Sequence, residues 1–144
     1  MYTFQVFQDE KDQGDLVLTN IYLLAGVSLP LWISSDLSKE NPLILLSGVL
    51  CIGIGDAFAS IIGSKFGKNH ILNTSKSLEG FFASILSQIV FIKILELFQL
   101  IVISQKISIF IVIMIVSAIE VITTQVDNIA LPFLMYSLMR YFVT

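Results

Sequence analysis

The chain has 144 residues, of which 56% are hydrophobic and 13% are charged, and its mean hydropathy is +0.88. A soluble domain of this size could not bury so much apolar surface, so most of the protein is expected to lie in lipid. The net charge of −3 argues against nucleic-acid binding, which requires a basic face. The single cysteine, Cys51, excludes an intramolecular disulfide and is expected to be a small buried hydrophobe.

Five apolar segments are candidates to cross a bilayer as helices, which takes about 20 residues each. In chain order they are residues 16–33, 43–62, 78–103, 107–123 and 129–143. The third is longer than a span requires, so we expect it to tilt or to end early in a turn at the interface. Since no linker-like tract separates the segments, the sequence predicts one all-α domain over residues 1–144, a polytopic membrane bundle with about five transmembrane helices.

The lysines between the segments predict the orientation of the bundle. The loop 63–77 carries Lys65, Lys68 and Lys76, whereas the connections after the first and third segments carry one lysine each. Cytoplasmic loops are enriched in Lys and Arg, so this loop is predicted to be cytoplasmic. A glycosylation sequon begins at Asn73 in the same loop, and we therefore expect Asn73 to carry no glycan.

An acidic residue, Asp56, stands inside the second segment. Helical periodicity places Ala59, Ser60, Gly63 and Gly67 on the same stripe. Burying a carboxylate in a membrane is costly, so such a residue normally faces a cavity or a partner and marks a functional site. Small residues at this spacing also allow close helix packing, so for them both packing and a site remain open.

Two more helical faces end near the same predicted membrane boundary. Counted at the same spacing, the first face begins at Glu120 and contains Thr123, Thr124 and Asp127. The second begins at Lys76 and contains Glu79, Gly80, Ala83 and Ser87. The loop between the second and third segments is basic and bears glycines, which suits a polyphosphate. Nearby carboxylates suit a magnesium ion that bridges such a polyphosphate. His70 in this loop is either a site residue or a solvated side chain.

Two short motif matches fail on their spacing or their partners. A Walker A loop needs four residues between its glycines and Ser or Thr after its lysine, but GSKFGKN has three residues and Asn69. The GIGD match to intramembrane aspartyl proteases lacks a second aspartate inside a predicted span, which those enzymes need to share a proton.

Three segments, GDAFASIIGSKFG, KSLEG and EVITTQVDNIALP, together resemble the polyprenol kinase family of CTP-dependent membrane enzymes. The resemblance extends over almost the whole chain and is to the C-terminal part of much longer proteins, so the chain is expected to be a fragment or a shortened paralogue. The stretches TTQVDN and LTNIYLL favour the branch that phosphorylates dolichol.

The resemblance implies a cytidine-nucleotide site between the two glycine-bearing helices. The positions that match its motif are Asp56, Ala59, Ser60, Gly63, Gly67, Lys76, Glu79 and Gly80. Lys65 and Lys68 are further candidates to neutralise phosphate charge. Asp56, Glu120 and Asp127 are the candidate catalytic acids and the candidate ligands of a divalent cation, with Mg²⁺ expected. Either Asp127 or Glu79 is the candidate to accept a proton.

The implied reaction is transfer of a phosphoryl group from CTP to dolichol, a long-chain polyprenol, at the cytoplasmic face of the endoplasmic reticulum membrane. Its products would be CDP and dolichyl phosphate, the lipid carrier for protein glycosylation. Two alternatives remain: a related CTP-dependent kinase that acts on phytol or diacylglycerol, and an inactive truncated membrane chain.

Overall fold

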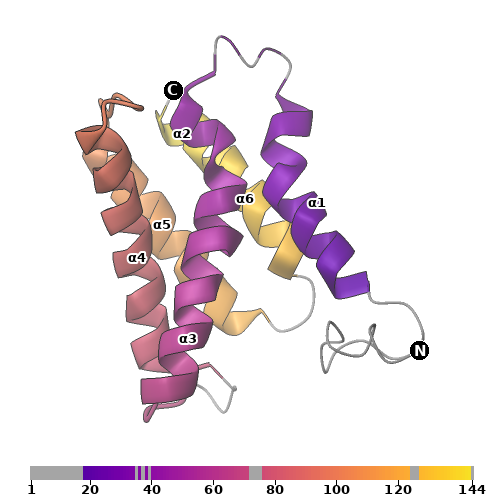
Figure 1. Ribbon diagram of the computed structural model, residues 1–144, viewed down its shortest axis with the longest axis vertical. Helices are drawn as coiled ribbons and strands as arrows, with labels where there is room; N and C mark the ends of the chain where they lie inside the picture. The colour runs from indigo at the N-terminus through magenta and orange to yellow at the C-terminus, as the bar shows by residue number, and fades with distance from the viewer. Residues whose placement is uncertain are drawn as a thin grey trace.

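The computed structural model describes residues 18–34, 36, 38, 40–71, 76–123 and 127–143. This part of the chain is all-α, as predicted, and its helices form a bundle (Figure 1). The elements in chain order are α1 (Leu18–Ile33), α2 (Pro42–Leu45), the π-helical stretch η2 (Val49–Asp56), α3 (Ala57–Phe66), α4 (Leu78–Leu97), α5 (Lys106–Ile122) and α6 (Asp127–Val143). In Figure 1 the end of α3, the start of α4 and the end of α5 all lie toward the lower end of the bundle.

Among the described residues, two helices are long and apolar enough to cross a membrane. They are Val49–Phe66, which joins η2 to α3, and α4. Helix α1 has 16 residues, and α5 and α6 have 17 each, so the five predicted spans are supported as helices but not all as membrane crossings. Large apolar side chains such as Trp32 and Ile107 lie about three-quarters exposed, which is typical of a surface in contact with lipid or a partner.

The third predicted segment ends early, as expected. Helix α4 stops at Leu97 instead of continuing to Ile103, and the chain turns through Gln99, whose φ of 58° lies in the left-handed region. Ile101, after the turn, is buried again. The chain therefore starts its return to α5 within a few residues of the helix end.

The second predicted segment, in contrast, continues beyond its predicted end at Ile62. Helix α3 runs through Gly63 to Phe66 and stops where Gly67 takes an extended conformation. The prediction was wrong because it placed the end where the apolar run stops, whereas the residues that follow are polar but still helical. The predicted loop 63–77 is consequently shorter and begins at Gly67.

The remaining helices of the bundle pack against η2 and against one another. Gly26 lets α1 lie against the start of α6, because a Cβ at that position would stand 1.7 Å from the carbonyl oxygen of Asn128. Cys51 is 2% exposed, as expected of a buried hydrophobe. Other fully buried side chains of the core are Leu50, Val112, Ile113, Val116, Met135 and Met139. This core fixes η2 against α4 and α6, and with it the position of Asp56.

Candidate functional site

A pocket of about 520 Å³ lies where η2 and α3, the start of α4 and the end of α5 meet. Eight of the residues predicted for the site line it: Asp56, Ala59, Ser60, Gly63, Gly67, Lys76, Gly80 and Glu120. These residues come from three separate stretches of the chain. The pocket therefore brings most of the predicted site into one place.

One wall of the pocket is the predicted stripe of the second helix. Asp56 is the last residue of η2, and Ala59, Ser60 and Gly63 follow on α3. The π-helical stretch of eight residues that leads to Asp56 was not predicted. Such stretches are rare and frequently occur at functional sites, because their wider turn changes which side chains face a neighbour.

The opposite wall is the first turn of α4, which lies in backbone contact with α3. A Cβ at Gly80 would stand 2.8 Å from the carbonyl oxygen of Ala59 and 3.4 Å from the Cα atom of Gly63. The packing reading of the small residues is therefore confirmed, since Ala59, Gly63 and Gly80 bring the two helices together. The same residues line the pocket, and their part in a site stays a prediction.

A short hairpin connects the two walls. The N–H of Leu78 donates to the carbonyl of Asn69 at 2.9 Å, and the N–H of Ile71 donates to the carbonyl of Lys76 at 3.0 Å. These bonds bring Lys76 and His70 to the pocket, where both line it. His70 is thus an exposed residue that lines the pocket, so both readings of that side chain stay open.

The start of α4 is fixed by Ser77. Its Oγ accepts a hydrogen bond from the N–H of Gly80 at 3.1 Å, which is a typical N-cap. The same residue is 4% exposed and lines the pocket. Lys76 therefore lies before the helix begins, and helical periodicity on α4 has to be counted from Ser77.

Counted in this way, the stripe on α4 contains Gly80, Phe81, Ser84 and Gln88, of which all but Gln88 line the pocket. The predicted stripe from Lys76 contained Ala83 and Ser87, which are not among the lining residues. The cap signal, a serine followed by Gly80 and a helical run, would have allowed the correct count. Ser84 was missed for this reason alone.

Glu79 lies in the first turn of α4 but does not line the pocket. Its Oε1 accepts a hydrogen bond from the side-chain amide of Asn69 at 3.0 Å. The contact joins α4 to the hairpin. The structure thus gives Glu79 a role in holding the hairpin.

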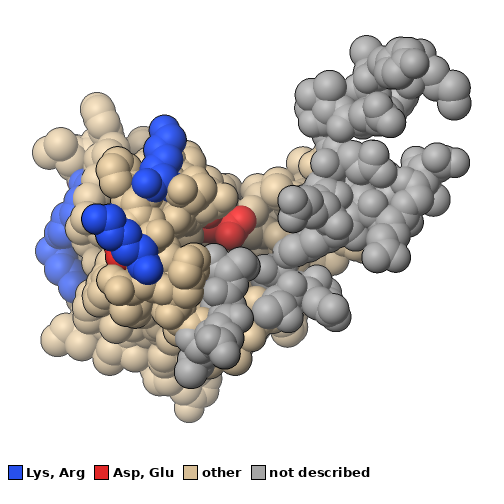
Figure 2. All heavy atoms as spheres, turned by 90° about the horizontal axis from the view of Figure 1, so that it is seen from below, with Lys and Arg blue, Asp and Glu red and all other residues tan. Residues whose placement is uncertain are grey.

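Lys65 and Lys68 also lie outside the lining and are exposed. Figure 2 shows the end of the bundle from below, with basic side chains gathered under the region of α3 and α4. An acidic side chain is visible nearer the middle of this face. The two lysines thus add positive charge around the pocket without forming its wall.

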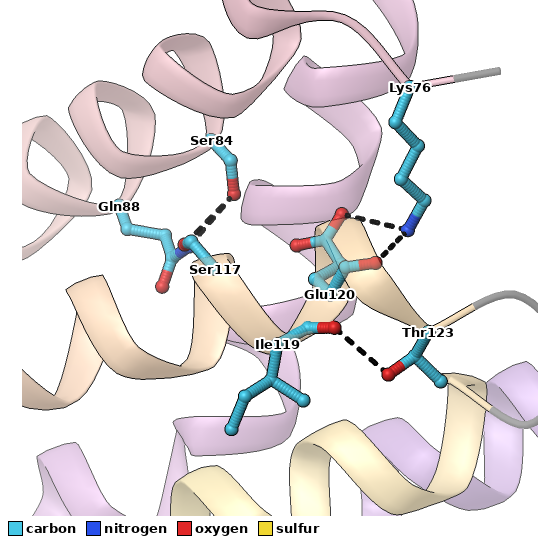
Figure 3. Close-up of polar contacts among 7 residues, drawn as sticks. All are labelled: Lys76, Ser84, Gln88, Ser117, Ile119, Glu120 and Thr123. Atoms are coloured by element: carbon cyan, nitrogen blue, oxygen red, sulfur yellow. Dashed lines mark hydrogen bonds and ion pairs between the residues drawn. The ribbon is translucent and has the colours of Figure 1, made fainter. Parts of the chain in front are cut away.

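Lys76 and Glu120 form the ion pair of the pocket (Figure 3). The Nζ of Lys76 lies 3.7 Å from Oε1 of Glu120 and donates to the backbone carbonyl of the same residue at 2.5 Å. The side chain of Glu120 is 6% exposed, so the lysine compensates a buried negative charge. The pair also ties the start of α4 to the end of α5.

Asp56 and Glu120 share two cavities. Besides the main pocket, they line a small one of about 10 Å³ together with Asn128, the second residue of α6. Asp127 begins α6, but its side chain lies outside the described residues, as does Thr124. The backbone nevertheless brings the start of α6, with Asn128, to the small cavity that Asp56 lines.

The fit of a divalent cation rests on these two carboxylates. No group of three or more His, Cys, Asp or Glu side chains that could hold a metal occurs within the described residues. Magnesium in phosphate sites commonly uses one or two carboxylates and takes its other ligands from phosphate oxygens and water. Asp56 and Glu120 offer two carboxylates on the wall of one pocket, and a cation site there stays a prediction.

Comparison with known proteins identifies relatives of the chain. It is 39% identical over 136 residues to the dolichol kinase of Mus musculus, 36% over 134 residues to dolichol kinase sec59 of Schizosaccharomyces pombe, and 33% over 138 residues to dolichol kinase EVAN of Arabidopsis thaliana. These matches cover 88%, 92% and 92% of this chain and 26%, 27% and 24% of the relatives.

The chain thus spans about a quarter of the length of the curated relatives it matches. No protein-family model and no solved structure matches it. The matched region nevertheless includes nearly the whole chain, and with it most of the pocket-forming segments. The chain is therefore homologous to a part of the dolichol kinases.

Proposed function

We propose that the pocket binds the nucleotide of a CTP-dependent kinase whose acceptor is dolichol, a long-chain polyprenol. The observation that carries the proposal is the convergence of eight predicted nucleotide- and metal-site residues on one pocket. The homology to dolichol kinases supports dolichol as the acceptor. CTP as the donor follows from the resemblance to the polyprenol kinase family.

The charges around the pocket suit a triphosphate. Lys76 and His70 lie on its wall, and the exposed Lys65 and Lys68 add positive potential on the same end of the bundle (Figure 2). A basic surface around a cleft raises the local concentration of an anionic substrate. We therefore assign Lys76 to phosphate contact and the other two lysines to attraction of the nucleotide.

Asp56 and Glu120, with Asp127 as a third candidate, would hold Mg²⁺, which neutralises charge on the β- and γ-phosphate oxygens when bound. Lys76 would hold Glu120 in place and reach phosphate oxygens from the same position. Gly63, Gly67 and Gly80 let the segments that form the wall of the pocket pack closely, because a Cβ at each of them would meet protein atoms of a neighbouring turn or helix.

In the proposed reaction the hydroxyl oxygen of dolichol forms a bond to the γ-phosphorus of CTP. The bond between that phosphorus and the β–γ bridging oxygen breaks, and CDP leaves. The proton of the alcohol passes to a carboxylate of the site, for which Asp127 and Glu79 are the two candidates. Glu79 accepts a hydrogen bond from Asn69, and Asp127 is the first residue of α6.

The position of the pocket suits two substrates of opposite solubility. It lies at the start of α4 and beside the helix Val49–Phe66, the two candidate membrane spans. The polyprenyl tail would remain in lipid while CTP enters from water. We place this end at the cytoplasmic face of the endoplasmic reticulum membrane, since the basic hairpin lies there.

The test is transfer of label from γ-³²P-CTP to dolichol in membranes that contain the full chain. We expect Asp56→Asn to reduce transfer by about 100-fold or more, because it removes a ligand of the cation that neutralises the reacting phosphate. Lys106→Ala, at the start of α5 and away from the pocket, should retain wild-type transfer. Full activity of Asp56→Asn would refute the assignment.

A panel of alcohols separates the related kinases. Dolichol, phytol and diacylglycerol are offered in turn under the same conditions. Preferred transfer to phytol or diacylglycerol would move the assignment to another branch of the family. Wild-type chain that binds no CTP at all would support the inactive alternative.

A further inference from the structure

Three buried polar side chains form a cluster at the inner side of the pocket: Ser84 and Gln88 on α4, and Ser117 on α5 (Figure 3). Nε2 of Gln88 lies 3.2 Å from Oγ of Ser84 and 3.5 Å from Oγ of Ser117, and the two Oγ atoms are 3.5 Å apart. All three residues are at most 2% exposed. The sequence analysis assigned none of them a role.

The amide of Gln88 holds the two serines in place. Its Nε2 lies within hydrogen-bonding distance of both Oγ atoms. Its Oε1 is buried and has no hydrogen-bond partner among the described residues. Gln88 lines neither of the two cavities that Asp56 lines, so the cluster meets the pocket through the hydroxyl groups of Ser84 and Ser117.

The depth of the cluster separates it from the nucleotide region. Ser84 and Gln88 follow the first residue of α4, Leu78, by six and ten positions, so they lie about 9 Å and 15 Å further along the helix axis. Their neighbours on the two helices, such as Ile85 and Val116, are buried and apolar. The cluster therefore lies toward the lipid interior from the charged mouth of the pocket.

The cluster is nevertheless continuous with the proposed reaction site. Ser84 and Ser117 line the same pocket as Asp56 and Glu120. Gly55, the residue before Asp56, makes room for the cluster, because a Cβ there would lie 2.6 Å from Nε2 of Gln88. The second glycine of the GIGD motif thus lets η2 approach the polar cluster closely.

We propose that Ser84 and Ser117, held in place by Gln88, bind the hydroxyl group of the lipid alcohol and hold its oxygen toward the γ-phosphate. The two serine side chains are neutral, which suits an alcohol and supplies no positive charge for a phosphate. A hydroxyl is both a donor and an acceptor, so it can donate to Oγ of one serine and accept from Oγ of the other. This inference rests on the proposed kinase function and adds the acceptor site to it.

The first test measures KM for dolichol and KM for CTP separately in each variant. Gln88→Met keeps the length of the side chain and removes the amide, and Ser117→Ala removes one hydroxyl without a large change in packing. Each is expected to raise KM for dolichol about fivefold and to leave KM for CTP within about twofold, as for the loss of one neutral hydrogen bond. Ser87→Ala, on the same helix but outside the pocket, is the matched control and should change neither constant.

A second readout does not depend on transfer. A polyprenol analogue with a diazirine next to its hydroxyl is photolysed with the full chain in nanodiscs, and cross-linked peptides are mapped by mass spectrometry. We expect label on residues 84–88 and near Ser117, and less label in Gln88→Met. Label at these positions in a chain without kinase activity would support the alcohol site and refute the kinase assignment separately.

Two results would overturn the proposal. One is a rise in KM for CTP with KM for dolichol unchanged, which would make the cluster part of the nucleotide site. The other is a lower melting temperature of both variants with both constants unchanged and the label elsewhere. In that case the cluster only joins α4 to α5, as polar residues between membrane helices often do.

Discussion

Replacing Gly80 with alanine is expected to push α3 and α4 apart and to weaken nucleotide binding. The new Cβ would lie 2.8 Å from the carbonyl oxygen of Ala59 and 3.4 Å from Cα of Gly63. Both are backbone atoms that cannot rotate away, so one helix has to move by about 0.5 Å to restore normal contact. Overpacking of this kind costs about 1–3 kcal/mol, while alanine regains about 1 kcal/mol of helix propensity.

The free energy of unfolding should therefore fall by at most about 2 kcal/mol, so that the variant still folds. The pocket wall is displaced at the same time, and the affinity for CTP should fall about tenfold. The matched control is Gly53→Ala, where the new Cβ would meet only Cγ1 of Val49, at 3.5 Å. This change should leave CTP affinity as in the wild type.

The assay combines thermal unfolding in detergent micelles with equilibrium binding of labelled CTP to all three proteins. Gly80→Ala should have a lower melting temperature or unchanged stability, and in either case it should bind CTP more weakly than Gly53→Ala does. Equal CTP affinities of the two variants would refute the claim that the approach of α3 to α4 shapes the nucleotide site.

Lys76→Met removes the cation paired with buried Glu120 and should lower the free energy of unfolding by about 1–3 kcal/mol, and adding Glu120→Gln should restore part of the loss. If chemical denaturation showed that the effects of the two substitutions on the free energy of unfolding simply add, this coupling would be contradicted. Glu79→Ala and Asn69→Ala each break the hydrogen bond that holds the hairpin, so both should weaken CTP binding by a similar factor of about five, with no further loss in the double variant. A double variant clearly weaker than either would argue against a shared role. Asn73 should show no shift in gel mobility after glycosidase treatment, and a shift would invert the predicted orientation.

The part of the site on α3 could be predicted because that helix is regular. Once Asp56 was taken as the reference, a period of 3.6 residues gave Ala59, Ser60 and Gly63, which all line the pocket. The cost of an acid in an apolar run was enough to identify the reference residue. Local periodicity and one strong physical constraint therefore predicted this wall.

The wall on α4 could be predicted only in part, since the N-cap of this helix lies one residue after the assumed reference. Lys76 lies before the N-cap Ser77, so a stripe counted from Lys76 is displaced by one position around the helix. This displacement replaced Ser84 by Ala83. The hydrogen bond from Gln88 to Ser84 joins residues on the same helix, but its extension to Ser117 depends on how α4 and α5 pack, which no local pattern contains.

The helix ends show the same limit. Apolar runs predicted the helices, but the polar end of α3 from Gly63 to Phe66 was assigned to a loop, because hydropathy measures lipid preference and not helix propensity. The π-helical stretch that ends at Asp56 packs against α4, where Gly55 lies close to Gln88, and could not be read from the spacing of residues.

The most direct test of the central claim is to locate bound CTP on the chain. A photoreactive CTP analogue is cross-linked to the full chain in nanodiscs in the presence of Mg²⁺, and the labelled peptides are identified by mass spectrometry. The account predicts label in residues 59–67 and 76–84 that excess CTP abolishes and that Asp56→Asn strongly reduces. Label confined to the opposite end of α4, around Lys93 and Lys106, or label unaffected by Asp56→Asn, would contradict it.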